Sequence, residues 1–144
     1  ALCFAIWFHD AVYNTRKRDN EELSAELAAE KLSQFKIPVE TIELVRQMVL
    51  ATKEHRNHGF SEDINFFLDF DLSILGSEDQ VYQSYSEAIR KEYWWVPTIL
   101  YRQGRRKVLE SFLERESIYF TSEMAQKYEQ QARRNIKREI ESLF

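Results

Sequence analysis

The sequence predicts an all-α fold, a single helical bundle of about seven helices. Glycine and proline are scarce, with Gly 3 and Pro 2 in 144 residues, whereas sheet-rich folds need many turns. Charged residues make up 31% of the chain and recur at helical spacing beside apolar ones, which is typical of amphipathic helices. With 44% hydrophobic and 14% aromatic residues, the chain has enough apolar surface for one folded domain, residues 1–144.

Four helices are expected in the first half of the chain. Pro38 suits the first position of a helix, and the apolar residues after it recur at spacings of three and four, which places them on one face. Ser61 can cap the next helix, which Gly76 then stops. The expected helical ranges are residues 1–13, 21–35, 38–55 and 64–75, with a polar loop at 14–20.

Three further helices are expected in the second half. Residues 77–80, Ser-Glu-Asp-Gln, match a capping box and begin a long helix, which Pro97 should kink or end near Trp95. Residues 104–115 form the next helix and residues 117–120 an extended link. Thr121 or Ser122 then caps a last helix that runs nearly to Phe144.

Composition excludes several classes of protein. The net charge of −4 argues against a nucleic-acid partner, and we expect none. Residues 1–8 are apolar but too short to cross a bilayer, which takes about 20 residues, so no membrane partner is expected. The single Cys3 rules out an internal disulfide and suits a small core residue in a cytoplasmic protein.

A His-Asp pair follows the apolar start of the chain. His9 and Asp10 lie at the end of the first expected helix, where a charged pair is costly unless it is compensated. A divalent metal is one compensation, since imidazole plus carboxylate is a normal ligand set for transition metals. The alternative is that both side chains face water at the helix end.

Two aspartates interrupt the strongly apolar stretch at residues 66–76. Asp69 and Asp71 are two positions apart, so on a helix they point about 200° apart and cannot both face one site. One is expected to be a metal ligand, and the other a supporting or exposed group.

Two more histidines follow the third expected helix. His55 lies near the apolar face of that helix, and it could bind phosphate, transfer a proton or bind a second metal. It could equally be an exposed residue at the helix end. His58 lies in a polar loop and is expected to be solvated.

Several stretches occur in a characteristic order and cover nearly the whole chain: Trp-Phe-His-Asp-Ala-Val-Tyr at 7–13, Asn-Glu-Glu-Leu-Ser-Ala at 20–25, Ala-Thr-Lys-Glu-His at 51–55, Leu-Asp-Phe-Asp-Leu-Ser-Ile-Leu-Gly at 68–76, Ile-Arg-Lys-Glu-Tyr at 89–93, Tyr-Arg-Gln-Gly-Arg at 101–105 and Ala-Arg-Arg-Asn at 132–135. Together they resemble one known family, the predicted metal-dependent phosphohydrolases of the HD superfamily.

The resemblance implies a metal ligand set of His, then His-Asp, then Asp. His9, Asp10 and Asp71 match the last three ligands, and Asp71 is preferred over Asp69 because the family's ligand precedes a Leu-x-x-Leu-Gly-like stretch. The first His, which the family carries in an upstream helix, has no counterpart here. Because the chain opens inside an uncapped apolar helix, we expect that native sequence is missing upstream; otherwise the site lacks this ligand.

The resulting hypothesis is hydrolysis of a phosphoester, of a nucleotide or a small phosphorylated metabolite, with Mn, Fe, Co, Ni, Zn or Mg as cofactor. His55 or Asp69 would assist proton transfer, and Glu21 or Glu22 would orient a ligand. A basic cluster could meet phosphate, or could simply be a solvated helix face: Arg102, Arg105, Arg106 and Lys107.

Two other functions remain open from the sequence. A helical module with an incomplete metal site could bind a nucleotide or a partner without cleaving it. Tyr93, Trp94 and Trp95 cannot all face one core, so a homodimer that pairs through them is a third hypothesis.

Overall fold

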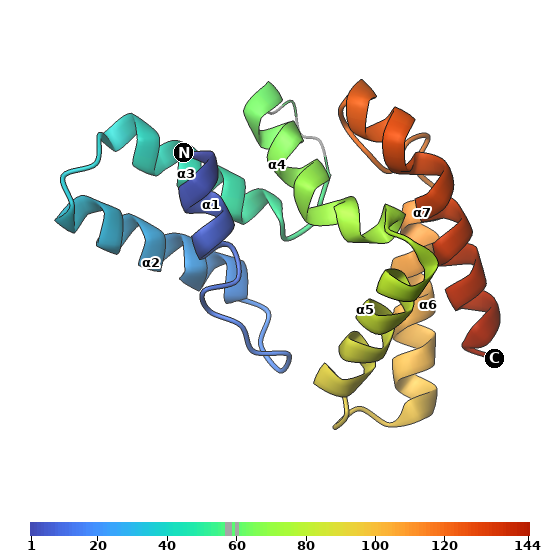
Figure 1. The fold of residues 1–144 in the computed structure, drawn as a ribbon. Coiled ribbons are helices and arrows are strands. Elements are labelled where there is room, and N and C mark those ends of the chain that lie inside the picture. The colour runs from blue at the N-terminus through green and yellow to red at the C-terminus, as the bar shows by residue number, and fades with distance from the viewer. Residues whose placement is uncertain (57–58, 60) are drawn as a thin grey trace. The chain divides into compact units, whose positions relative to one another are not determined.

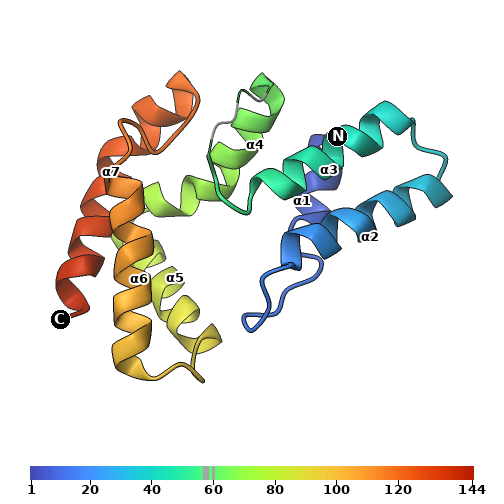
Figure 2. The same ribbon diagram turned by 180° about the vertical axis from the view of Figure 1, so that it is seen from behind.

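The computed structural model describes residues 1–56, 59 and 61–144, and His58 lies outside these residues. Its described part contains seven α-helices, one short 3-10 helix and no strand (Figures 1 and 2). The predicted all-α fold is therefore confirmed. The chain divides into two compact units, Ala1–Asp71 and Leu72–Phe144, and each is described by itself. That the chain forms a single domain stays a prediction.

Unit 1 is built around a helical hairpin. Helix α2 (Asn20–Gln34) packs along α3 (Val39–Ala51), and α1 (Leu2–Phe8) contacts both of them. Helix α4 (Glu62–Leu72) begins after the loop that follows α3 and ends at the unit boundary. The buried apolar side chains of the unit come from all four helices: Ala5, Ala25, Ala28, Leu32, Ile42, Val45, Met48, Val49, Ala51, Ile64, Phe67 and Leu68.

Unit 2 has its own hydrophobic core. It contains the 3-10 helix η1 (Ser73–Gly76), α5 (Asp79–Glu92), α6 (Thr98–Leu113) and α7 (Ser122–Ser142). Helix α7 contacts η1, α5 and α6 and so organises the unit. The core side chains are Leu72, Leu75, Tyr82, Leu109, Ile118, Tyr119, Met124, Ala132 and Ile136.

Several helix boundaries differ from the predicted ones. Helix α1 ends at Phe8 instead of continuing to residue 13, and α4 gives way to η1 at Ser73. Helix α6 begins at Thr98 rather than at residue 104. Pro97, with φ −52, is the N-cap of this helix, so the proline ends the connection before α6 and also marks the start of α6. Gly104 is then an interior residue of α6.

The predicted capping box at residues 77–80 is wrong. The hydroxyl of Ser77 donates to the carbonyl of Ile74 at 2.7 Å, so it is engaged with η1 and does not cap α5. The N-cap of α5 is Glu78, whose side chain makes no capping hydrogen bond. A serine hydroxyl can bond either to the backbone of the preceding turn or to the first N–H groups of the following helix, and at Ser77 the preceding turn is preferred.

The first helix is much more exposed than its composition predicts. Ala5 is its only buried residue, Trp7 is 81% exposed, and Cys3 is exposed, so the expectation of a core cysteine is wrong. A helix of seven residues has two turns and presents only one narrow face to α2 and α3. In the part of the chain that the structure describes, no helix combines the length and the apolar character needed to cross a membrane.

Gly76 is required by a close approach between η1 and α7. A Cβ built at this position would lie 2.6 Å from the Cβ of Tyr128, 2.9 Å from the Tyr128 carbonyl oxygen and 2.9 Å from the Tyr119 hydroxyl. Two of these atoms belong to the backbone or to a Cβ, which cannot move without shifting α7. A Cβ at Gly104, in contrast, would meet nothing within 4 Å.

We predict that Gly76→Ala destabilises the protein by about 1–3 kcal/mol, because the added methyl overpacks the contact with α7. Gly104→Ala is the matched control, and it should stabilise α6 by up to about 1 kcal/mol through helix propensity. Urea denaturation followed by circular dichroism measures both changes. Equal effects from the two substitutions would contradict the proposed packing.

Candidate metal and phosphate site

Four side chains predicted from the sequence meet at one end of unit 1. His9 and Asp10 follow α1, His55 follows α3, and Asp71 comes from the last turn of α4. The Nε2 of His9 lies 3.3 Å from Asp10 Oδ2 and 3.6 Å from Asp71 Oδ1. The Nε2 of His55 lies 2.6 Å from Asp71 Oδ2. The tertiary fold of this unit therefore joins residues that are far apart in the sequence.

The orientation of His9 is determined by its own helix. Its Nδ1 donates to the carbonyl oxygen of Ile6 at 3.0 Å, and its ring lies edge-on to Phe67, with 6.0 Å between the ring centroids. Because Nδ1 is occupied by a backbone carbonyl, Nε2 is the nitrogen directed at the two carboxylates. This is the arrangement by which proteins orient a metal-binding imidazole.

His55 occupies a left-handed backbone conformation, with φ 46. Such a conformation is unfavourable for a residue with a Cβ and usually marks a functional or tightly constrained position. Its backbone N–H still bonds to Ala51, at 3.1 Å, as the chain leaves α3. This turn brings the ring to Asp71, where Nε2 donates to the carboxylate that also faces His9.

The two aspartates of α4 have different surroundings, in agreement with their spacing. The side chain of Asp71 is 27% exposed and faces both histidines. Asp69 is fully buried, and the helical period turns it to another side of α4. The structure therefore brings Asp71, and not Asp69, to His9.

The donor spacing can be compared with that of a metal site. Two donor atoms that each bind one ion at about 2.0–2.2 Å lie roughly 3.3–3.6 Å apart in tetrahedral geometry. The separations of 3.3 and 3.6 Å from His9 Nε2 to the two carboxylates agree with this range. Among the described residues, however, no three His, Cys, Asp or Glu side chains form a ready-made metal site. Only the two distances from His9 are within this range, and the Asp10 side chain is 69% exposed.

The two carboxylates change the protonation of His9. The hydrogen bond that His9 donates to the Asp10 carboxylate is the main cause that raises the pKa of His9 from 6.5 to about 9, and the charge of Asp71 raises it further, against partial burial. The same hydrogen bond lowers the pKa of Asp10. Without a metal, a protonated imidazole supplies the positive charge between the carboxylates.

Glu22 was predicted to orient a metal ligand, and the structure places its side chain against Lys53 instead. It forms an ion pair with Lys53, and the hydrogen bond from this lysine is the main cause that lowers the pKa of Glu22. Its Oε2 atom is buried without a hydrogen-bond partner among the described residues. Sequence reasoning missed Lys53, although its place two residues before His55 was a usable signal. The supporting roles of Glu21 and Glu22 stay predictions.

The predicted phosphate-binding arginines lie on α6, in unit 2. Arg102 is exposed. Arg105 is 9% exposed, and its Nε and Nη2 donate to the two carboxylate oxygens of Glu139 at 2.7 and 3.1 Å. Tyr82 donates to the same carboxylate at 2.6 Å. Most of the fork that would bind phosphate is therefore engaged inside the unit, which favours a structural role for Arg105.

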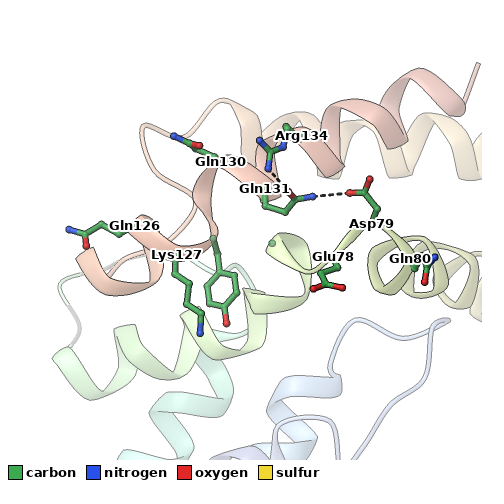
Figure 3. A pocket seen from close by; sticks show the side chains of 10 residues that line it. Glu78, Asp79, Gln80, Gln126, Lys127, Gln130, Gln131 and Arg134 are labelled. Atoms are coloured by element: carbon green, nitrogen blue, oxygen red, sulfur yellow. Dashed lines mark hydrogen bonds between the residues drawn. The ribbon is translucent and has the colours of Figure 1, made fainter.

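A surface pocket of about 650 Å³ lies between the start of α5 and α7 of unit 2 (Figure 3). Two of its lining side chains bond to each other, since the Gln131 amide donates to Asp79 at 2.9 Å, and Gln131 also donates to Asn135 of α7 at 3.0 Å. Asn135 in turn donates to the carbonyls of Leu75 and Ser77. These bonds hold the turn after η1 against α7, and none of the predicted site residues lines the pocket.

No protein-family model matches this chain, and the comparisons with curated proteins and with solved structures also found no match. The resemblance to the HD superfamily therefore stays a prediction.

We predict that His9 of the metal-free protein titrates with a pKa of about 9 in NMR. Asp10→Asn should move this pKa toward 6.5, because it removes the main hydrogen bond. Asp63→Asn, an exposed position in the first turn of α4, is the matched control and should leave it unchanged.

The same shift sets the sign of a pH effect on stability. Because the pKa of His9 is raised by folding, its stabilising contribution is complete below about pH 6.5 and is lost as the pH rises to about 9. A His9 pKa near 6.5 in the folded protein would contradict the arrangement.

We predict that Arg105→Ala lowers the free energy of unfolding by about 3–5 kcal/mol, because it leaves the Glu139 carboxylate buried without its cation. Arg102→Ala, on the exposed face of the same helix, should change it by no more than about 0.5 kcal/mol. Chemical denaturation of both variants separates the structural role of Arg105 from a role in phosphate binding. If Arg105→Ala is as stable as the unaltered protein, the structural role is contradicted and Arg105 is again a candidate for binding phosphate.

Proposed function

We propose that this protein is a metal-dependent phosphohydrolase of the HD-superfamily type, acting on a phosphoester of a nucleotide or a small phosphorylated metabolite. The observation that carries the proposal is the meeting of His9, Asp10 and Asp71 at one end of unit 1. The donors come from two segments, the end of α1 and the last turn of α4, and two carboxylates directed at one imidazole favour a positive charge between them.

The three residues would hold the metal through Nε2 of His9 and one carboxylate oxygen each of Asp10 and Asp71. This mixed donor set suits Mn, Fe, Co, Ni or Zn, and Mg is a further candidate. When bound, such an ion supplies a Lewis acid that activates water and polarises the phosphoryl group. The bond from His9 Nδ1 to Ile6 keeps the imidazole in the tautomer that this role requires.

His55 is proposed to orient Asp71 and to assist proton transfer. Its hydrogen bond at 2.6 Å engages Asp71 Oδ2, which leaves Asp71 Oδ1 directed at His9. Its ring is 21% exposed, so it is accessible from solvent. Asp69 is a weaker candidate for this role, because a fully buried carboxylate does not reach a bound substrate.

A second function is supported by a specific observation. The described residues contain no complete metal site, which suits a module that binds a nucleotide or a protein without cleaving it. Pairing of two copies through the α5–α6 connection remains part of the proposal, since Trp94 is 74% exposed.

We also place the protein in the cytoplasm, because an exposed free thiol suits a reducing compartment.

Metal binding and turnover test the proposal together. We predict that the protein binds one equivalent of Mn²⁺, Ni²⁺ or Zn²⁺ in calorimetry and hydrolyses members of a phosphoester panel in its presence. Asp71→Asn should weaken metal binding by at least about tenfold, because it removes a charged ligand. Asp63→Asn makes the same chemical change on the same helix and should bind metal as the unaltered protein does.

The outcomes separate the two functions. Metal binding with turnover supports the hydrolase. Binding of nucleotide without turnover by the metal-loaded protein supports the binding module. Absence of metal binding, or equal binding by Asp71→Asn, overturns the metal site.

A further inference from the structure

Four large apolar side chains are exposed where α5 turns into α6, and we name them the hydrophobic tip. Trp94 is 74% exposed and Ile99 is 69% exposed, and Trp95 and Leu100 are exposed as well. All four lie within seven consecutive residues, at one end of unit 2 (Figures 1 and 2). Single exposed apolar residues are ordinary, but a group of them in one short segment indicates an interaction surface.

The backbone of this segment bonds largely to itself. The N–H groups of Tyr93, Trp94 and Val96 each donate to a backbone carbonyl three or four residues earlier, at 3.0–3.2 Å. Pro97 has no N–H group. Because an apolar medium offers no water to unbonded backbone groups, this pattern suits a surface that enters such a medium.

Arg90 fixes the shape of the segment. Its Nη1 donates to the Tyr93 carbonyl at 2.7 Å, and its Nη2 donates to the Val96 carbonyl and to Thr98 Oγ1, both at 3.4 Å. Its guanidinium carbon also lies 4.6 Å from the centroid of the Tyr101 ring. The end of α5 and the start of α6 are thereby held together, and a preorganised surface loses less conformational entropy when it binds.

Cations flank the hydrophobic tip in an otherwise acidic protein. Residues 90–107 contain six Lys and Arg and one acid, Glu92, whereas the whole protein has a net charge of −4. Arg105 and Arg106 are paired with carboxylates outside this stretch. Four cations and Glu92 remain, which leaves an excess of three positive charges around the tip.

Three of these cations are exposed and form no ion pair in the part of the chain that the structure describes: Lys91, Arg102 and Lys107. Lys91 lies three residues before Trp94, and Arg102 lies three residues after Ile99, so each is close to one turn of helix from the tip. The other acids of α5 and α6 are already bonded to other side chains: Asp79, Glu87 and Glu110.

The charge of this surface distinguishes between its possible occupants. In a symmetrical pair of copies, the same cations would face each other across the interface, and like charges repel. An anionic lipid surface supplies the opposite charge and accepts apolar side chains at the same time. Tryptophan in particular prefers the boundary between water and hydrocarbon, where its ring is buried and its N–H stays hydrated.

We propose that the hydrophobic tip docks the protein on an anionic lipid surface, with Trp94 and Ile99 among the upper acyl chains and Lys91 and Arg102 among the headgroups. The contact is peripheral and needs no spanning helix. The expectation of no membrane partner considered only a segment that crosses the bilayer, and this proposal replaces it. The contact does not depend on the candidate site of unit 1.

Vesicle binding by the full chain tests the proposal. The probes are vesicles of phosphatidylcholine alone and vesicles that mix it equally with phosphatidylglycerol. We expect at least about tenfold tighter binding to the mixed vesicles, and this binding should weaken as salt is added. In the Trp7→Phe protein, fluorescence reports Trp94 and Trp95 alone, and lipids brominated on their acyl chains should quench it.

Two double substitutions separate the apolar and the charged contributions. Trp94→Ser with Ile99→Ser should weaken binding to the mixed vesicles by at least about tenfold, because burial of apolar area drives insertion. Lys91→Gln with Arg102→Gln should weaken it by about tenfold or more and remove most of the salt dependence. All four side chains are exposed, so both variants should fold, which circular dichroism checks.

Matched controls make the same kinds of change in unit 1. Trp7→Ser with Val39→Ser removes a tryptophan and an aliphatic residue that are also strongly exposed. Lys31→Gln with Lys36→Gln removes two exposed positive charges. Both controls should bind the mixed vesicles as the unaltered protein does, and equal weakening in a control and in its counterpart at the tip overturns the proposal.

Four other results would also overturn it. The first is absence of binding to the mixed vesicles, and the second is binding without quenching by the brominated lipids, which means attraction to the headgroups only. The third is pairing of two copies in sedimentation that Trp94→Ser with Ile99→Ser abolishes, without vesicle binding. The fourth is tighter binding of a poly-glutamate peptide than of the vesicles, which indicates an acidic protein partner.

Discussion

The constraint on which unit 1 depends is the need for positive charge between Asp10 and Asp71. Both carboxylates face the same nitrogen of His9, and neither is fully solvated. A protonated His9 meets this need in the metal-free protein, which is why the pKa of His9 is raised. Under the proposed function, a divalent cation bound between the same carboxylates would take over this charge.

Unit 2 also contains a carboxylate that needs compensation, and there the compensating groups are side chains of the same unit. The carboxylate of Glu139 is buried, and it receives two hydrogen bonds from Arg105 and one from Tyr82. Its charge is therefore neutralised by residues of the same unit, with little capacity left for a ligand. A buried pair of this kind contributes to a defined packing of α5, α6 and α7, whereas His9, Asp10 and Asp71 of unit 1 are all partly exposed.

The sequence was sufficient for the fold class and for much of the candidate site. Helical spacing and scarce glycine predicted the helices, and the two-residue interval correctly separated Asp69 from Asp71. The sequence did not predict that Arg105 is buried in an ion pair, because its partner Glu139 is distant in the sequence and is brought near only by packing. For the same reason, the hydrogen bond from Lys53 to the Arg18 carbonyl and the close approach at Gly76 were visible only in three dimensions.

Crystals grown with Zn²⁺ and measured at the zinc absorption edge test the central claim most directly. The account predicts one anomalous peak bonded to His9 Nε2 and to carboxylate oxygens of Asp10 and Asp71, at about 2.0–2.2 Å. A peak bound elsewhere, with His9 still paired directly to the two carboxylates, would contradict it.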